Sequence, residues 1–195
     1  MALTAAVAIP IAAAAHSPLL AWRDPIYILG GFAGILGLCV LLFQPLLAAG
    51  SLPGLLLHLA RKVHRWTGIA LVVLVLVHVS ALWITSPPDV IDALLFRSPT
   101  PFAVWGVVAM WAVFAAALLA AMRRRLRLRP RVWRIMHVSF AIVIVVGTVV
   151  HAVLIEGAME AVSKVALCTL VLLVTLGSLA RVKLWTRRKP SGPPA

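Results

Sequence analysis

The sequence predicts an all-α fold, a polytopic membrane helix bundle of about six transmembrane helices with both termini cytoplasmic. Apolar residues make up 63% of the chain and charged residues only 12%, with a mean hydropathy of +1.08, whereas soluble domains are about a quarter charged. Several apolar runs reach the roughly 20 residues that cross a bilayer core. Most basic residues lie between these runs, as expected for loops that set membrane orientation.

Turns rich in Pro, Gly and Ser divide the chain into successive elements. Residues 1–25 contain Pro10 and Pro18 and no basic stretch before the apolar run, so they are interpreted as a weak first span or a re-entrant segment and not as a signal peptide. The bundle itself is expected at 26–185, followed by a disordered cytoplasmic tail at 186–195. Its spans are predicted at 26–49, 63–85, 102–122, 133–155 and 161–185. The loop at 86–101 has room for one amphipathic turn at 90–96.

The charges predict the orientation of the bundle. Placing the 50–65 loop, the 123–134 loop and the tail on one side puts 15 of the 18 basic residues there and all five acidic residues on the other side. An excess of Lys and Arg marks the cytoplasmic side, here of a bacterial inner membrane. If the first segment does not cross, five spans remain and the N-terminus lies outside. Topology therefore accounts for the net charge of +13, and nucleic-acid binding is not expected.

Two of the predicted spans each carry two histidines with the same separation. His64 and His78 are fourteen residues apart, and so are His137 and His151. At about 100° and 1.5 Å per residue, this spacing puts both histidines of a span on one face, roughly 21 Å apart along the axis. Both spans run outward, so His64 is expected level with His137 near the cytoplasm, and His78 level with His151 near the outer surface.

Two facing imidazole pairs at two depths predict two cofactor sites, because cofactors in bundles are held by inward side chains on facing helices. A planar macrocycle between each pair would take one axial nitrogen from each helix, which predicts two haems with bis-His ligation. Such a haem has no open position and suits electron transfer. Proton-relay histidines are the alternative. A copper or zinc site is disfavoured, because no carboxylate or thiol lies at the same depth.

Smaller features near the histidines fit this interpretation. Gly68 and Gly147 each lie four residues from a histidine on the same helix face, where a missing side chain would leave room for a flat ring or would serve helix packing. Arg65 and Arg134 lie near the inner pair and are candidates to meet haem propionates, although positive-inside placement also accounts for them. Glycines with the small-xxx-small spacing of closely packed helices occur at Gly30 and Gly34.

The segments "VHRWTGIALVVLVLVH" and "WRIMHVSFAIVIVVGTVVH", each following a basic loop, resemble the ferric reductase-like transmembrane domain. The resemblance extends over roughly residues 26–185, and its specific part is the pair of histidine spacings. It implies two b-type haems, ligated by His64 with His137 and by His78 with His151. It also implies that electrons pass from the cytoplasm outward.

The end of the chain departs from the larger members of that family. Ferric reductases and NADPH oxidases continue into a flavin and nicotinamide module, whereas this chain stops ten residues after Trp185, too few for a dinucleotide fold. The chain is therefore more similar to stand-alone haem-binding membrane subunits. The expected donor is a cytosolic flavin reductase or quinol, and the expected acceptor is a periplasmic oxidoreductase or a ferric chelate.

Other functions stay open at this point. A transporter or proton channel would use the histidines as relay groups, but transporters usually break their helices at mid-depth, and neither histidine span carries a mid-span Pro. A purely structural membrane anchor would leave the histidine register a coincidence. The sequence also leaves open whether a flavin binds.

Overall fold

Seven α-helices and one 3₁₀ turn make up the computed structural model, which describes residues 2–186 and has no strand within them. The all-α prediction is therefore confirmed. The helices are α1 (Ala2–Ala15), α2 (Pro25–Ala49), α3 (Leu57–Thr85), α4 (Pro87–Leu94), α5 (Pro101–Met122), α6 (Pro130–Leu154) and α7 (Ala161–Thr186), with the 3₁₀ turn at Pro18–Leu20. The expected tail at 186–195 lies outside the described residues from 187 onward.

Five of these helices, α2, α3, α5, α6 and α7, are long and apolar enough to cross a membrane. Their ends agree with the predicted spans within three residues, except that α3 begins at Leu57. No Gly or Pro separates the turn at Gly54 from the predicted start at Val63, so nothing prevents the helix from starting earlier. The predicted loop at 86–101 likewise contains a short helix, α4.

The N-terminal segment forms a helix of 14 residues, which is about 21 Å long and shorter than the roughly 30 Å hydrocarbon core. This helix, α1, continues through Pro10 and ends before Pro18, so only the second proline interrupts the segment. It packs against α7 and α2 and buries Ala14 completely. The bundle thus has five long helices and one shorter apolar helix. Whether α1 spans or re-enters stays a prediction.

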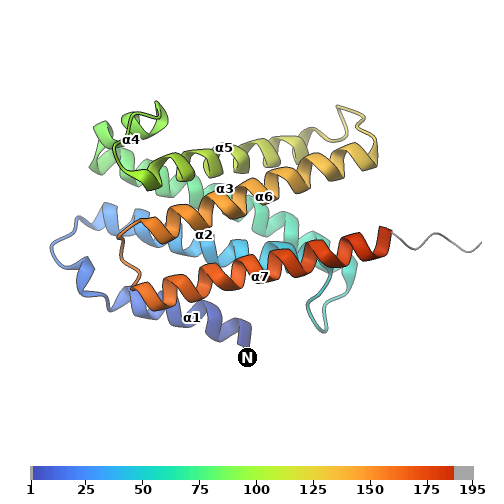
Figure 1. Cartoon of the computed structure of the whole chain (residues 1–195), viewed down its shortest axis with the longest axis horizontal. Helices are drawn as coiled ribbons and strands as arrows, with labels where there is room; N and C mark the ends of the chain where they lie inside the picture. Colours follow the sequence, from blue (N-terminus) through green and yellow to red (C-terminus); the bar gives the residue numbers. More distant parts are fainter. Residues whose placement is uncertain (1, 187–195) are drawn as a thin grey trace, which may run out of the picture.

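The long helices form two antiparallel pairs, α2 with α3 and α5 with α6, and α7 packs against both α2 and α6. Figure 1 shows that α3 and α6 run in the same direction, opposite to α2, α5 and α7. The loops at 50–56 and 123–129 therefore lie at the same end of the bundle as the end of α7. Side chains of α2 and α7, among them Leu42, Leu167 and Val171, are fully buried in the core.

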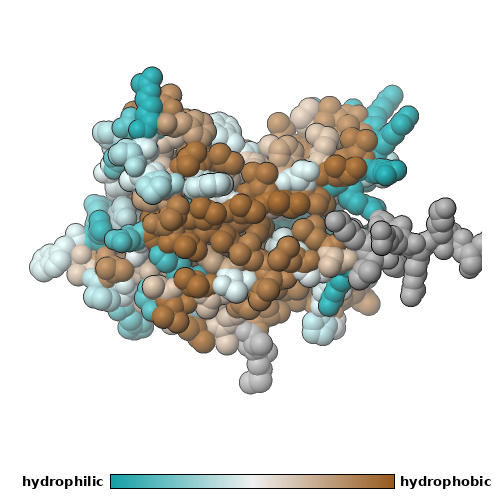
Figure 2. All heavy atoms as spheres, viewed as in Figure 1, coloured by the Kyte–Doolittle hydropathy of each residue, from teal (hydrophilic) through white to brown (hydrophobic). Residues whose placement is uncertain are grey.

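One face of the molecule has an apolar middle and polar ends (Figure 2). Figure 2 shows apolar side chains across the middle of one face, with hydrophilic side chains gathered at both ends of the bundle. Helix caps lie at these ends. Asp24 accepts the backbone N–H of Ile26 at the start of α2, and Glu160 accepts the N–H of Ser163 at the start of α7. The latter bond lowers the pKa of the Glu160 carboxyl, because it favours the charged form.

Candidate functional site

The structure brings the four histidines together as two pairs between α3 and α6. The ring centroids of His64 and His137 are 6.2 Å apart, and those of His78 and His151 are 6.4 Å apart. The two rings of each pair are steeply inclined, at 78° and 82°. Because α3 and α6 run the same way, the first pair (the inner pair) lies toward the basic loops, and the second pair (the outer pair) lies toward α4.

Backbone carbonyls hold both rings of the outer pair. Nδ1 of His78 lies 2.7 Å from the carbonyl oxygen of Gly30 on α2, and Nδ1 of His151 lies 3.0 Å from that of Phe102 on α5. Because a carbonyl oxygen only accepts, Nδ1 of each ring carries the proton and donates. The nitrogen left with a free lone pair is Nε2, which is the arrangement found in metal-binding histidines.

Two glycines allow the outer rings to come this close to the neighbouring helices. A Cβ atom at Gly34 would lie 3.2 Å from Nδ1 of His78, and one at Gly106 would lie 2.7 Å from Nδ1 of His151. The first is tighter than most Cβ contacts, and the second would require the His151 ring to shift. Each ring thus occupies the space that a side chain would fill.

The inner pair is held by stacking. The ring of Trp133, one turn before His137 on α6, is parallel to it within 10° at a centroid distance of 5.1 Å, and the guanidinium of Arg123 lies 4.3 Å from the Trp133 ring centroid. Among the described residues, three buried nitrogens here have no hydrogen-bond partner: Nδ1 of His64, Nδ1 of His137 and Nε1 of Trp133. The inner site therefore contains polar groups that the protein alone leaves unsatisfied.

The other predicted site residues lie near the pairs but make different contacts. A Cβ at Gly147 would lie 3.0 Å from the Trp105 carbonyl and 3.1 Å from Cβ of Ala109, so this glycine permits close packing of α6 on α5. At Gly68 the nearest atom would be Nε2 of Gln44, 4.0 Å away. Arg65 and Arg134 are exposed, and their contact with propionates stays a prediction.

Sequence reasoning missed the role of the two glycines beside the outer pair. Gly30 and Gly34 were expected only to pack helices closely. Gly30 does so, since a Cβ there would lie 2.9 Å from Cβ of Ala81, whereas Gly34 faces His78. Gly106 stands alone in α5 and gave no pattern to recognise. The signal that could have found them is a glycine that faces a histidine on the adjacent helix of the same antiparallel pair.

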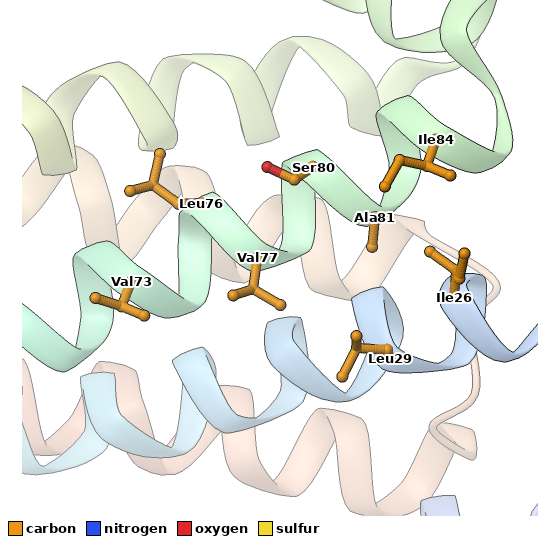
Figure 3. Close-up of a pocket in the computed structure, with 8 residues that line it drawn as sticks. All are labelled: Ile26, Leu29, Val73, Leu76, Val77, Ser80, Ala81 and Ile84. Carbon is orange, nitrogen blue, oxygen red and sulfur yellow. The ribbon is translucent and has the colours of Figure 1, made fainter.

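An open groove of about 280 Å³ lies between α2 and α3, outside the histidine pairs. Figure 3 shows that its lining is apolar apart from Ser80. None of the four histidines belongs to this lining, so the groove is separate from the candidate site. In a bilayer, lipid chains are expected to fill an apolar groove of this kind.

Comparison with known families gives a match over most of the region from α2 to α6. Residues 30–148 match the family described as the ferric reductase like transmembrane component. The chain belongs to this family. The matched region contains His64, His78 and His137, and His151 lies three residues beyond it. Among curated proteins and solved structures, none matches the chain.

Membership of the ferric reductase like transmembrane family indicates a role in membrane electron transfer, and members of the family commonly bind haem. In the described part of the chain, no group of three or more His, Cys, Asp or Glu side chains comes together. Each histidine pair therefore offers two protein ligands. Two imidazoles suit a metal that brings its own equatorial donors, as the iron of a porphyrin does.

Proposed function

We propose that this protein is a di-haem b-type membrane cytochrome that relays electrons across the inner membrane. His64 and His137 would hold the inner haem, and His78 and His151 the outer one. The observation that carries the proposal is the pair of facing imidazoles found twice, at 6.2 and 6.4 Å, on two helices of the same direction. When bound, haem supplies a one-electron couple at each of two depths.

The distances within the pairs support a metal between the rings. Metal–imidazole bonds are about 2 Å long, and a five-membered ring with bonds of about 1.33 Å has a radius near 1.1 Å. Two opposed imidazoles on one metal ion therefore have centroids about 6.3 Å apart. Both observed separations, 6.2 and 6.4 Å, agree with this value. Edge-to-face ring pairs cover a wider range of about 4.5–7 Å, so the support for a metal is that nearly the same value occurs at both depths.

The chemistry of the surrounding groups supports electron transfer over oxygen binding. Two imidazoles from the protein would complete the coordination of a haem iron and would leave no position for oxygen. In the outer pair, the carbonyls of Gly30 and Phe102 fix the tautomer of His78 and His151, so Nε2 is the ligating nitrogen. In the inner pair, Trp133 fixes the orientation of the His137 ring by stacking.

The charge distribution supports an outward direction of transfer in a bacterial inner membrane. The basic loops lie at the end of the bundle near the inner pair, and an excess of Lys and Arg marks the cytoplasmic side. Electrons would enter there from a separate donor, a flavin reductase or quinol. They would leave near the outer pair to a periplasmic oxidoreductase or a ferric chelate.

The optical spectrum of the purified protein tests the proposal. Reduction with dithionite should give the sharp visible bands of low-spin bis-His haem. His78→Ala and His151→Ala should each remove about half of the haem, because each breaks one of two sites. His58→Ala is the matched control, since this exposed histidine near the start of α3 belongs to neither pair. A colourless protein that conducts protons would contradict the proposal.

A further inference from the structure

The two histidine pairs differ in what their Nδ1 atoms contact. In the outer pair, His78 and His151 each donate to a backbone carbonyl of the neighbouring helix, at 2.7 and 3.0 Å. In the inner pair, Nδ1 of His137 is buried without a hydrogen-bond partner among the described residues, and Nδ1 of His64 lies near the Gln44 backbone without a well-formed hydrogen bond. The inner and outer histidines are thus paired in the same way across α3 and α6, but their Nδ1 atoms have different surroundings.

The outer carbonyls belong to a local arrangement that occurs on two helices. On α2, the carbonyl of Gly30 is followed four residues later by Gly34, and on α5 the carbonyl of Phe102 is followed four residues later by Gly106. The histidine ring lies over the glycine and reaches the carbonyl one turn earlier. We refer to each carbonyl with its glycine as an outer slot.

The inner positions lack the glycine of such a slot. Each inner histidine precedes the outer histidine of its own helix by fourteen residues. Because the adjacent helix runs in the opposite direction, the carbonyl that would face the inner histidine lies fourteen residues after the one that faces the outer histidine. Gln44 on α2 is thus the counterpart of Gly30, and Ala116 on α5 that of Phe102. The residues four positions further along are alanines in both helices, Ala48 and Ala120. Where a slot needs a missing Cβ, the inner register supplies a methyl group.

We propose that Gly34 and Gly106 are positioning residues that lower the reduction potential of the outer haem below that of the inner haem. This inference rests on the proposed function, and it requires an acceptor whose potential is high enough to draw electrons outward against this difference. A hydrogen bond from Nδ1 makes Nε2 a stronger electron donor to a metal, and stronger axial donation stabilises ferric over ferrous iron. Positive charge at the inner end, including Arg123 beside Trp133, works in the same direction, because it favours the less positive, reduced iron.

A redox titration of the full chain in detergent, followed by visible spectroscopy, tests the order of the two potentials. The wild-type protein should titrate in two steps. The lower midpoint should be the one that disappears in the double variant His78→Ala, His151→Ala, which keeps the inner pair. An outer midpoint equal to or above the inner one would overturn the inference.

Substitution of the glycines tests the cause. Gly34→Ala and Gly106→Ala push the rings away from the carbonyls, so each should raise the outer midpoint and leave the inner midpoint unchanged. Gly31→Ala is the matched control on α2, because a Cβ there meets nothing within 4 Å, and both midpoints should stay at their wild-type values. Alanine variants that keep both haems and both wild-type midpoints would contradict the inference.

The two proposals fail differently in these experiments. A chain that binds no haem contradicts the proposed function itself. A chain that binds two haems with the opposite order of midpoints contradicts only the role of the slots. If alanine at Gly34 or Gly106 causes loss of the outer haem, the redox titration of the wild-type protein tests the inference alone, through the order of its two midpoint potentials.

Discussion

At the scale of single residues, the site depends on what surrounds each imidazole as much as on the histidines themselves. The sequence predicted all four histidines and their pairing by depth from two equal spacings, because helix geometry converts fourteen residues into one face and about 21 Å. It could not predict that the carbonyls of Gly30 and Phe102 accept from the outer pair. Every residue has a carbonyl, so only the packing of the helices selects one.

Trp133 provides a test at this scale. Trp133→Ala removes the ring stacked on His137, and an aromatic pair of this kind contributes about 0.5–1.5 kcal/mol beyond its buried area. In a His78→Ala background, where only the inner haem is expected, it should weaken haem retention several-fold during dilution, measured by absorbance. Trp133→Phe keeps a stacked ring and should retain most of the haem. Equal losses in both variants would show that stacking is not what holds His137.

At the scale of helices, hydropathy located the five long helices well, and its failures have local causes. The start of α3 was placed too late because the charged residues Arg61 and Lys62 suggested a loop, yet charged residues are good helix formers near a membrane surface. Helix α4 was anticipated only as a single amphipathic turn, because its run of eight residues is too short for a periodic pattern. The contacts of Gly147 depend on how α6 crosses α5. The residues around Gly147 in the sequence do not predict this crossing.

Gly147→Ala tests the packing of α6 on α5. The added Cβ would meet the Trp105 carbonyl at 3.0 Å and Ala109 at 3.1 Å, and overpacking of this kind costs about 1–3 kcal/mol. The melting temperature in detergent should therefore fall by several degrees. Gly177→Ala is the control, because nothing lies within 4 Å of its Cβ and alanine favours helix. A Gly147 variant with wild-type melting but less haem would instead assign this glycine to the haem pocket.

At the scale of the whole molecule, two antiparallel helix pairs present their histidines to each other, and α7 packs against both. The pairs α2–α3 and α5–α6 each supply one ring, one carbonyl and one glycine to the outer site. The distribution of charged residues predicts which end of the bundle is cytoplasmic. The packing of the helices does not determine this orientation. Orientation is therefore a separate prediction from the fold.

Thiol labelling of intact cells tests the orientation. Asp92→Cys on α4 should react with a membrane-impermeant reagent from the periplasm, and Leu126→Cys in the basic loop should react only after the cells are opened. Both positions are exposed, and the native Cys39 and Cys168 are buried, so they give little background. The reverse pattern would place the basic loops outside and contradict the proposed direction of transfer.

The central claim is that four imidazoles hold two haems inside the bundle, and the ratio of haem to protein tests it most directly. A pyridine haemochrome assay on the purified full chain, with protein measured by amino-acid analysis, should give about two haems b per chain, one for each imidazole pair. A ratio near zero in protein expressed with ample haem would contradict the account.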